Sequence, residues 1–224
     1  MTELVSAFCA WLLASAISGQ NGASAPRVRI VAIGDSTTAG TPAYFSPLES
    51  PPAGRGDATS QYAYWLMQSH REWEVVNRGV NGERSDQIRA RFDRDAVETK
   101  PAVVIVIAGV NDVYQGKPAD HVIDQLRWMY DRGLKAGIQV VAGTIIPYNT
   151  ASDDQNARMR EINAWIRRQS EASPGVHFVD TRAAVAAAGE PDRLSETADQ
   201  LHPSPSGYRA MAEAIRPVLE RILR

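Results

Sequence analysis

The chain has 224 residues, of which 44% are hydrophobic and 22% charged, as in an ordinary soluble globular protein of one domain. Its 24 Lys and Arg residues nearly balance its 26 Asp and Glu residues, so the formal net charge is −2. That balance provides no net attraction to nucleic acid or to an anionic membrane. The single cysteine, Cys9, excludes an internal disulfide and a zinc site built from cysteines.

The N-terminal residues differ from the rest of the chain. Residues 4–25 carry no charge, and the apolar part of this stretch, residues 4–17, is 14 residues long. A run of that length is too short to span a bilayer as a helix, but it suits the apolar core of a secretory signal peptide. No Lys or Arg precedes the run, which leaves an N-terminal helix packed on the domain as the alternative. We expect a leader over residues 1–25, and one domain over residues 26–224 that is exported to the periplasm or beyond; without a signal peptide it would be cytoplasmic.

Apolar runs bounded by turn residues predict buried strands, and apolar residues recurring every three or four positions predict helices. Residues 102–108 (AVVIVIA) are apolar throughout, as expected for a central parallel strand covered on both faces. In chain order, the predicted strands are 28–33, 73–77, 102–108, 138–146 and 176–179. The predicted helices are 59–71, one with Ser85 as N-cap, one starting at Pro118, then 158–171 and 206–223.

Some segments depart from this regular alternation. Residues 41–57 contain four prolines and two glycines, and we expect them to form a long irregular loop of the kind that is often functional. Pro217 lies inside the last predicted helix and is expected to kink it. On the helix after Ser85, three arginines are expected to form a solvated face: Arg89, Arg91 and Arg94.

Five strands alternating with helices predict an α/β fold. The expected architecture is a single three-layer, flavodoxin-like domain, with a five-stranded, mostly parallel sheet and helices on both faces. In such folds the functional groups gather beyond the carboxyl ends of the strands. The residues that directly follow each strand are therefore the first candidates for a site.

Polar residues that suit nucleophilic catalysis stand at these positions. Ser36 lies on a tight turn after the first strand, where its hydroxyl can be presented to a substrate. A serine needs a base to remove its proton, and His202, just before the last helix, is the candidate. Asp199, three residues earlier, can hold the imidazole and stabilise its charged form. Asp180, at the end of the fifth strand, is the rival partner for His202.

The same edge of the sheet also offers donors for a developing oxyanion. Gly79 after the second strand provides a backbone N–H, Asn111 after the third provides a side-chain amide, and the N–H of Ser36 is a third donor. Each has a simpler alternative. Ser36 would by itself be a helix cap, Gly79 a turn residue in competition with Gly82, and Asn111 part of an Asx turn with Asp112.

Taken together, these residues resemble the SGNH branch of the GDSL esterase/lipase family. Four motifs occur in order: Gly-Asp-Ser at 34–36, the glycine at Gly79, Gly-x-Asn-Asp at 109–112 and Asp-x-x-His at 199–202. The resemblance implies Ser36 as nucleophile, His202 as base and Asp199 as its partner. It further implies an oxyanion hole of Ser36, Gly79 and Asn111, and no cofactor or metal. Thr37 stands where the family name has Leu, and the proline-rich loop 41–57 makes inference of the substrate from the family unsafe.

The leading functional hypothesis is a serine esterase that works through an acyl-enzyme. We expect small O-acyl esters as substrates, such as acetyl groups on carbohydrate, with lysophospholipids or acyl thioesters as the alternative. Nucleic acid and stable membrane insertion are not expected. The loop 41–57 is expected to decide acyl-chain preference, and three aromatic residues are candidate substrate contacts: Tyr44, Phe45 and Tyr114.

Two hypotheses come from other classes of protein. A metal-dependent phosphoesterase would use Asp35, Asp112, Asp199 and His202 around divalent ions, but it leaves Ser36 and Gly79 without a role. A non-catalytic flavodoxin-like module would hold a phosphate in residues 34–40, which lack the lysine and the glycine spacing of a phosphate loop. Inhibition by a fluorophosphonate, but not by a chelator, distinguishes the esterase from both.

Overall fold

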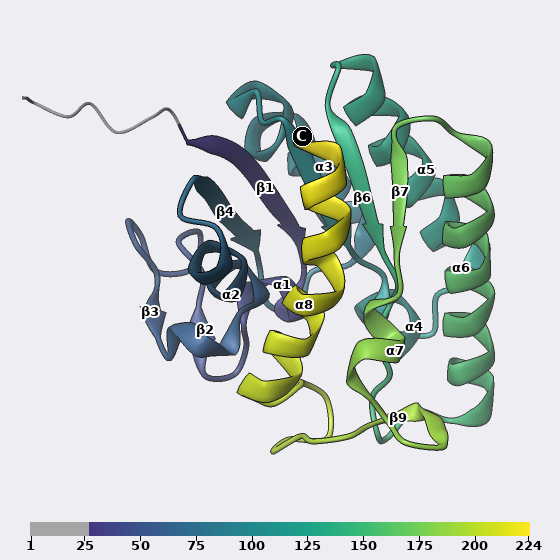
Figure 1. The fold of residues 1–224 in the computed structure, drawn as a ribbon. Coiled ribbons are helices and arrows are strands. Elements are labelled where there is room, and N and C mark those ends of the chain that lie inside the picture. The colour runs from purple at the N-terminus through teal and green to yellow at the C-terminus, as the bar shows by residue number, and fades with distance from the viewer. Residues whose placement is uncertain (1–26) are drawn as a thin grey trace, which may run out of the picture.

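The computed structural model describes residues 27–224, so the leader expected over residues 1–25 lies outside the described residues. A five-stranded sheet forms the centre, with the strand order β4-β1-β5-β6-β7 and every neighbouring pair parallel (Figure 1). This confirms the expected parallel sheet, and the order, in which the second strand lies outside the first, is that of a flavodoxin-like fold. The strands are β1 (Val28–Gly34), β4 (Trp73–Gly79), β5 (Val103–Ile107), β6 (Gln139–Gly143) and β7 (Val176–Val179).

Helices cover both faces of the sheet, because successive side chains of a strand point to opposite sides. Ile30 and Ala32 of β1 pack in one buried cluster with α2 (Tyr62–Ser69) and α8 (Pro205–Ile222), and Figure 1 shows α8 in front of the sheet. Val31 and Ile33 pack in the other buried cluster. The helices of that second layer are α3 (Ser85–Asp95), α5 (Ala119–Lys135) and α6 (Asp153–Ala172). Two apolar layers therefore enclose the sheet, as the three-layer prediction requires.

Hydrogen bonds at the helix ends explain where the observed bounds differ from the predicted ones. α6 begins before residue 158 because Ser152 caps it. The Ser152 hydroxyl accepts the Gln155 N–H, and the Gln155 side-chain oxygen accepts the Ser152 N–H at 2.9 Å. The sequence predicts Ser85 as the N-cap of α3, but it is the first residue of that helix. Its N–H and its hydroxyl both donate hydrogen bonds to the Asp112 carboxylate. α8 continues as one helix through Pro217.

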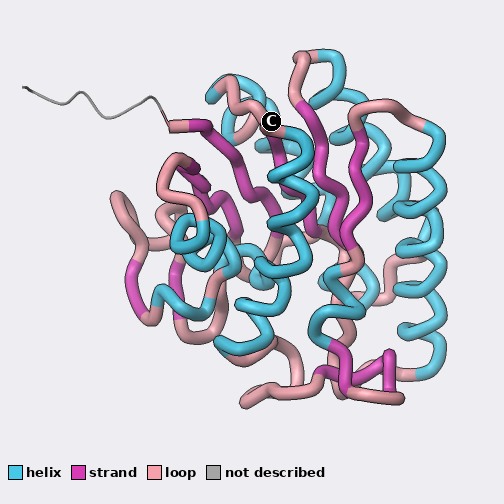
Figure 2. Tube along the Cα trace, viewed as in Figure 1, coloured by secondary structure: helices cyan, strands magenta, loops and turns pink. Residues whose placement is uncertain are grey.

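Several short elements lie outside the main layers, and Figure 2 distinguishes them by colour. The loop 41–57 is more regular than expected, because it contains a small antiparallel hairpin of β2 (Tyr44–Phe45) and β3 (Arg55–Gly56). A second hairpin, β8 (Ala186–Ala187) with β9 (Glu190–Leu194), precedes the Asp199 region. The remaining short helices are α1 (Ser36–Ala39), η1 (Ala58–Ser60), η2 (Val97–Thr99), α4 (Val110–Tyr114) and α7 (Thr181–Val185).

The register of the three adjacent strands brings the polar motifs together. Gly34 at the end of β1 is level with Gly79 of β4 on one side and with Ile107 of β5 on the other. The segments that follow these residues therefore leave the sheet side by side. Among residues 27–224, no helix is both long enough and apolar enough to cross a bilayer.

Candidate active site

A pocket of about 150 Å³ lies where these segments leave the sheet. It brings together residues from five separate parts of the chain, and Ser36, Asn111 and His202 are among them. Its full lining is Ser36, Thr37, Asn81, Val110, Asn111, Tyr114, Tyr148, Leu201 and His202. A larger surface pocket of about 330 Å³ lies between α2 and α8, but its lining contains no pairing of a nucleophile with a base such as Ser36 with His202.

The turn that carries Ser36 is held by backbone and side-chain bonds. Asp35 caps α1, and its carboxylate accepts a hydrogen bond from the Thr37 N–H at 2.9 Å. Burial raises the pKa of Asp35 to about 7, against the lowering effect of the bonds from Thr37. Ser36 is only 4% exposed, yet it lines the pocket, and its hydroxyl makes no hydrogen bond to another residue within 27–224. The hydroxyl is therefore free to meet a ligand.

His202 and Asp199 form a short hydrogen bond. The ring Nδ1 of His202 is 2.6 Å from Asp199 Oδ2, and the other oxygen of Asp199 accepts the N–H groups of Leu201 and His202 at 2.9 and 2.8 Å. Burial would raise the pKa of Asp199, but these bonds outweigh it and lower the pKa to about 2. An ionised Asp199 favours the tautomer with the proton on Nδ1, which leaves the lone pair of Nε2 available as a base.

The backbone conformation at Gln200 allows the side chains of Asp199 and His202 to meet. Gln200 has φ of 67°, in the left-handed region that a residue with a Cβ seldom adopts. Its carbonyl accepts the N–H of Asn149 at 2.8 Å, which ties this turn to the segment after β6. The resulting turn is tight, which is consistent with the 2.6 Å contact between Asp199 and His202.

Asp180, the rival partner for His202, has a structural role instead. Its carboxylate caps α7 by accepting the Ala183 N–H at 3.0 Å, and it also accepts the hydroxyl of Thr144 at 3.2 Å. These contacts hold Asp180 at the start of a helix, while Asp199 occupies the position beside His202. The geometry thus pairs His202 with Asp199.

The structure does not support Gly79 as an oxyanion donor. Its N–H already donates to Asn77 Oδ1 at 2.9 Å, its carbonyl accepts the Ser46 hydroxyl at 2.6 Å, and it is not part of the pocket lining. A Cβ at Gly79 would lie 2.1 Å from the Ala39 nitrogen. This residue is glycine because β4 and α1 approach each other closely here.

Gly82, the competing glycine, has the free backbone N–H. Its φ is 76°, a Cβ would have no neighbour within 4 Å, and its N–H has no hydrogen-bond partner in the described part of the chain. It directly follows Asn81, which lines the pocket. Asn111 also lines the pocket, and its Nδ2 donates to the carbonyl of Glu83 at 2.9 Å. One of the two amide protons of Asn111 is thereby committed, and the other remains available.

The four groups expected for a metal-dependent phosphoesterase do not form a single cluster, although Asp199 and His202 are bonded to each other. Within 27–224, the cluster whose spacing suits a metal ion consists of Asp86, Asp112 and His121, and it omits Asp35, Asp199 and His202. Both oxygens of Asp112 are engaged by Ser85, at 2.8 Å each. Burial raises the pKa of Asp112 in spite of these bonds. Asp112 therefore positions the start of α3 rather than a ligand in the pocket.

Of the three aromatic residues expected to contact substrate, one lines the pocket. Tyr114 does so and makes an edge contact with the ring of Tyr148, at 5.8 Å between centroids. Tyr44 is buried and donates its hydroxyl to the Ala53 carbonyl at 2.9 Å, because the loop folds back on itself as a hairpin. Phe45 is 45% exposed and outside the pocket lining, with the Arg55 guanidinium over its ring. Tyr44 and Phe45 therefore lie outside this pocket, unlike Tyr114.

The pocket also contains residues that sequence reasoning missed. Tyr148, Val110 and Leu201 form most of its apolar wall together with Tyr114. Tyr148 comes shortly after β6, and Val110 directly follows the β5 exit. Their positions after strands were the signal that could have identified them.

Comparison with known sequences identifies a family and two similar proteins. The model of the GDSL-like lipase/acylhydrolase family matches residues 32–210. The chain is 27% identical over 153 residues to an acetylxylan esterase of Geobacillus stearothermophilus, an alignment that covers 62% of this chain and 69% of that protein. It is also 27% identical over 125 residues to the uncharacterized lipoprotein YqeF of Bacillus subtilis, covering 53% of this chain and 48% of that protein.

Solved structures show the same fold. A lipolytic protein of the G-D-S-L family from Desulfitobacterium hafniense superposes with a TM-score of 0.69 at 24% identity, over 86% of this chain and all of that one. The acetylxylan esterase Axe2 from Geobacillus stearothermophilus gives a TM-score of 0.67 at 24% identity, over 88% of this chain and 94% of that one. With the family match spanning the whole pocket, this chain belongs to the GDSL-like lipase/acylhydrolase family and is a carboxylic ester hydrolase.

Proposed function

We propose that the protein is a metal-independent serine esterase in which Ser36, His202 and Asp199 form the catalytic triad. The observation that carries this proposal is the pocket that Ser36 and His202 share, with His202 bonded to Asp199 at 2.6 Å. His202 Nε2 removes the proton as Ser36 Oγ attacks the ester carbonyl carbon. The tetrahedral intermediate then collapses, the C–O bond to the alcohol breaks, and the histidine gives its proton to the leaving alkoxide. Water, deprotonated by His202, hydrolyses the acyl-enzyme in the same two stages.

In this mechanism the oxyanion receives hydrogen bonds from the N–H groups of Ser36 and Gly82 and from the Asn111 amide. Gly82 replaces Gly79 in this role, because the N–H of Gly79 is bonded to Asn77. Donors of this kind matter because they are already in place when negative charge develops on the carbonyl oxygen. Ser36 makes no hydrogen bond to His202 in the free protein, and such contacts commonly tighten when substrate binds.

The size of the pocket supports a small acyl group. The pocket beside Ser36 has a volume of about 150 Å³, and its apolar wall consists of Val110, Tyr114, Tyr148 and Leu201. The loop 41–57 contributes no residue to this wall, so the acyl-size limit lies with the tyrosines and not with the loop. The similarity to an acetylxylan esterase favours acetyl groups on carbohydrate as the substrate class. A lysophospholipase or acyl thioesterase would need room for a longer chain. Export from the cytoplasm remains part of the proposal, and the similarity to a lipoprotein is compatible with it.

The test combines a variant, an inhibitor and a substrate panel. Ser36→Ala is expected to keep the melting temperature and to lose on the order of 10⁴-fold or more in kcat. Ser170→Ala changes a half-buried serine on α6 whose hydroxyl donates to the Arg167 carbonyl, far from the pocket lining; it is the matched control and should keep full activity. Retention of more than about one part in a hundred of the activity in Ser36→Ala would remove Ser36 as nucleophile.

The other two arms address metal dependence and substrate class. A fluorophosphonate should label Ser36 and abolish activity, while a chelator should leave activity unchanged; the reverse result would support the phosphoesterase. Across p-nitrophenyl esters of rising chain length, kcat/KM should be highest for acetate and fall steeply beyond it. Acetylated xylo-oligosaccharides, run beside the panel, test the carbohydrate part of the proposal, and a preference for long acyl chains would refute it.

A further inference from the structure

The segment 80–84, which links β4 to α3, supplies or supports every part of the proposed oxyanion hole apart from the Ser36 N–H. Asn81 lines the pocket, Gly82 has the free N–H, and the carbonyl of Glu83 holds the amide of Asn111 at 2.9 Å. The backbone of this segment is exposed in part, and Gly82 has no packing neighbour where a Cβ would stand. Its position must therefore be fixed by contacts made elsewhere.

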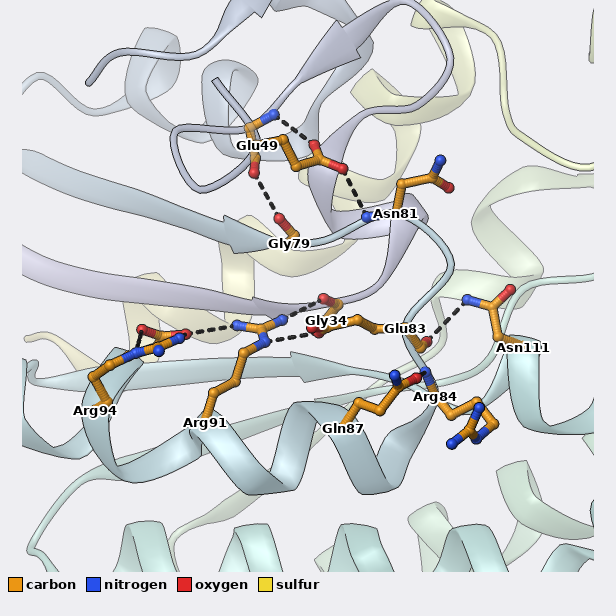
Figure 3. Close-up of polar contacts among 12 residues, drawn as sticks. Gly34, Glu49, Gly79, Asn81, Glu83, Arg84, Gln87, Arg91, Arg94 and Asn111 are labelled. Carbon is orange, nitrogen blue, oxygen red and sulfur yellow. Dashed lines mark hydrogen bonds and ion pairs between the residues drawn. The ribbon is translucent and has the colours of Figure 1, made fainter. Parts of the chain in front are cut away.

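Arg91 on α3 makes those contacts from beneath the segment. Its Nε donates to Glu83 Oε2 at 2.7 Å, and one terminal nitrogen donates to the Gly34 carbonyl at 3.0 Å (Figure 3). The other terminal nitrogen donates to Asp95 at 3.0 Å. The Arg91 side chain is only 8% exposed, so it is buried and not on a solvated face as the sequence suggested. One guanidinium thus binds the end of β1, the segment 80–84 and its own helix.

These bonds connect the nucleophile turn to the oxyanion donors. Gly34 directly precedes Asp35 and Ser36, and its carbonyl also accepts the Val80 N–H at 3.1 Å. The planar, forked guanidinium fixes the angle between its partners as well as their distance. Because Arg91 holds both Gly34 and the side chain of Glu83, it sets where the Glu83 carbonyl stands relative to Ser36.

A second carboxylate holds the same segment from the opposite side. Glu49, in the loop 41–57, accepts the Asn81 N–H at 2.8 Å with one oxygen and the Ser46 N–H at 2.8 Å with the other. Figure 3 shows Glu49 and Arg91 on either side of the segment. The proline-rich loop therefore contributes to the site as a support and not as a wall of the pocket.

We infer that Arg91 and Glu83 are positioning residues, which aim the free amide proton of Asn111 at the carbonyl oxygen of the substrate. The inference rests on the proposed function, because it requires Asn111 to be an oxyanion donor. The Glu83 carbonyl accepts a hydrogen bond from one N–H of the Asn111 side-chain amide and so fixes the rotation of that amide. A displaced carbonyl turns the second proton away from the oxyanion, and small errors of position in such a site have large effects on rate.

A double-mutant cycle on kcat tests the inference. We expect Glu83→Ala, which keeps the backbone carbonyl but frees it from Arg91, to lower kcat about 10- to 100-fold with KM nearly unchanged. In an Asn111→Ala background the same change should lower kcat by less than about threefold, because the group that Glu83 positions is already gone. Glu83→Gln keeps an acceptor for Arg91 and should recover most of kcat. If Glu83→Ala folds poorly, Glu83→Asp, whose carboxylate is one carbon shorter, takes its place in the cycle and should lower kcat with the same dependence on Asn111. Arg94→Ala is the control, since Arg94 binds Asp95 on the same helix and touches neither Glu83 nor Gly34.

The possible results distinguish failure of this inference from failure of the proposed oxyanion hole. Losses that multiply in the double variant would overturn the inference, because Glu83 would then act independently of Asn111. A normal kcat in folded Glu83→Ala would overturn it as well, even if the melting temperature falls. A normal kcat in the single Asn111→Ala variant would refute the oxyanion assignment itself, and that result is recognisable without the double variant.

Discussion

The hydroxyl of Tyr148 is in an unusual position. It is buried without a hydrogen-bond partner in the described part of the chain, yet the residue lines the pocket beside Ser36 and His202. Burial, together with a smaller effect of Tyr114 and against that of Arg158, raises the pKa of Tyr148 to about 12. The hydroxyl is therefore neutral under assay conditions and able to donate. A buried polar group without a partner is destabilising unless a ligand satisfies it, and we predict that bound substrate does so.

The substitution Tyr148→Phe removes this hydroxyl and almost no volume. An unsatisfied buried hydroxyl costs about 1–3 kcal/mol, so the variant should be more stable by up to that amount. In a domain of this size each kcal/mol corresponds to about 2–4 °C in melting temperature. A hydrogen bond to the substrate contributes about 0.5–1.5 kcal/mol, so kcat/KM should fall about 2- to 13-fold.

Tyr130→Phe is the matched control. The hydroxyl of Tyr130 is also buried without a partner, but the residue lies in the core against Trp165 and not in the pocket. This variant should gain stability in the same way and keep its kcat/KM. Thermal melting and kcat/KM for p-nitrophenyl acetate, measured on both variants, decide the matter. A lower melting temperature for Tyr148→Phe, or an unchanged kcat/KM, would refute the role assigned to the hydroxyl.

Two further predictions concern stability. Burial would lower the pKa of His70, but hydrogen bonds to Glu72 and Glu220 outweigh it and raise the pKa. The stabilisation from charged His70 is therefore complete below its ordinary pKa of about 6.5 and is lost as pH rises through the raised value in the folded protein. The melting temperatures of wild type and His70→Gln should differ most at acidic pH and converge once the pH exceeds the raised pKa of His70. A difference in melting temperature that does not depend on pH would contradict this. Gly79→Ala should reduce the yield of folded protein or lower the melting temperature, because its Cβ would lie 2.1 Å from the Ala39 nitrogen, and a variant that melts like wild type would disprove that packing role.

The sequence by itself determined the fold and predicted the residues of the candidate site. Continuous apolar runs such as 102–108 identified the buried strands, and their alternation with helices identified the parallel sheet that the structure confirms. Because parallel strands end at one edge, Ser36 and Asn111 could be expected near each other, and the structure places both in one pocket. The pairing of Asp199 with His202 follows from a spacing of three residues, so it too is local information.

Tertiary structure decided which groups near that edge are free and which are occupied. Gly79 and Gly82 are equivalent as turn glycines in the sequence, but the fold bonds one N–H to Asn77 and leaves the other open. Likewise, Arg91 matches its helix neighbours in composition, yet it is buried because the end of β1 and the segment 80–84 converge on it. Sequence periodicity reports which face of an element is apolar. The hydrogen-bond partner of a polar atom depends on segments far apart in the chain, and packing alone brings those segments together.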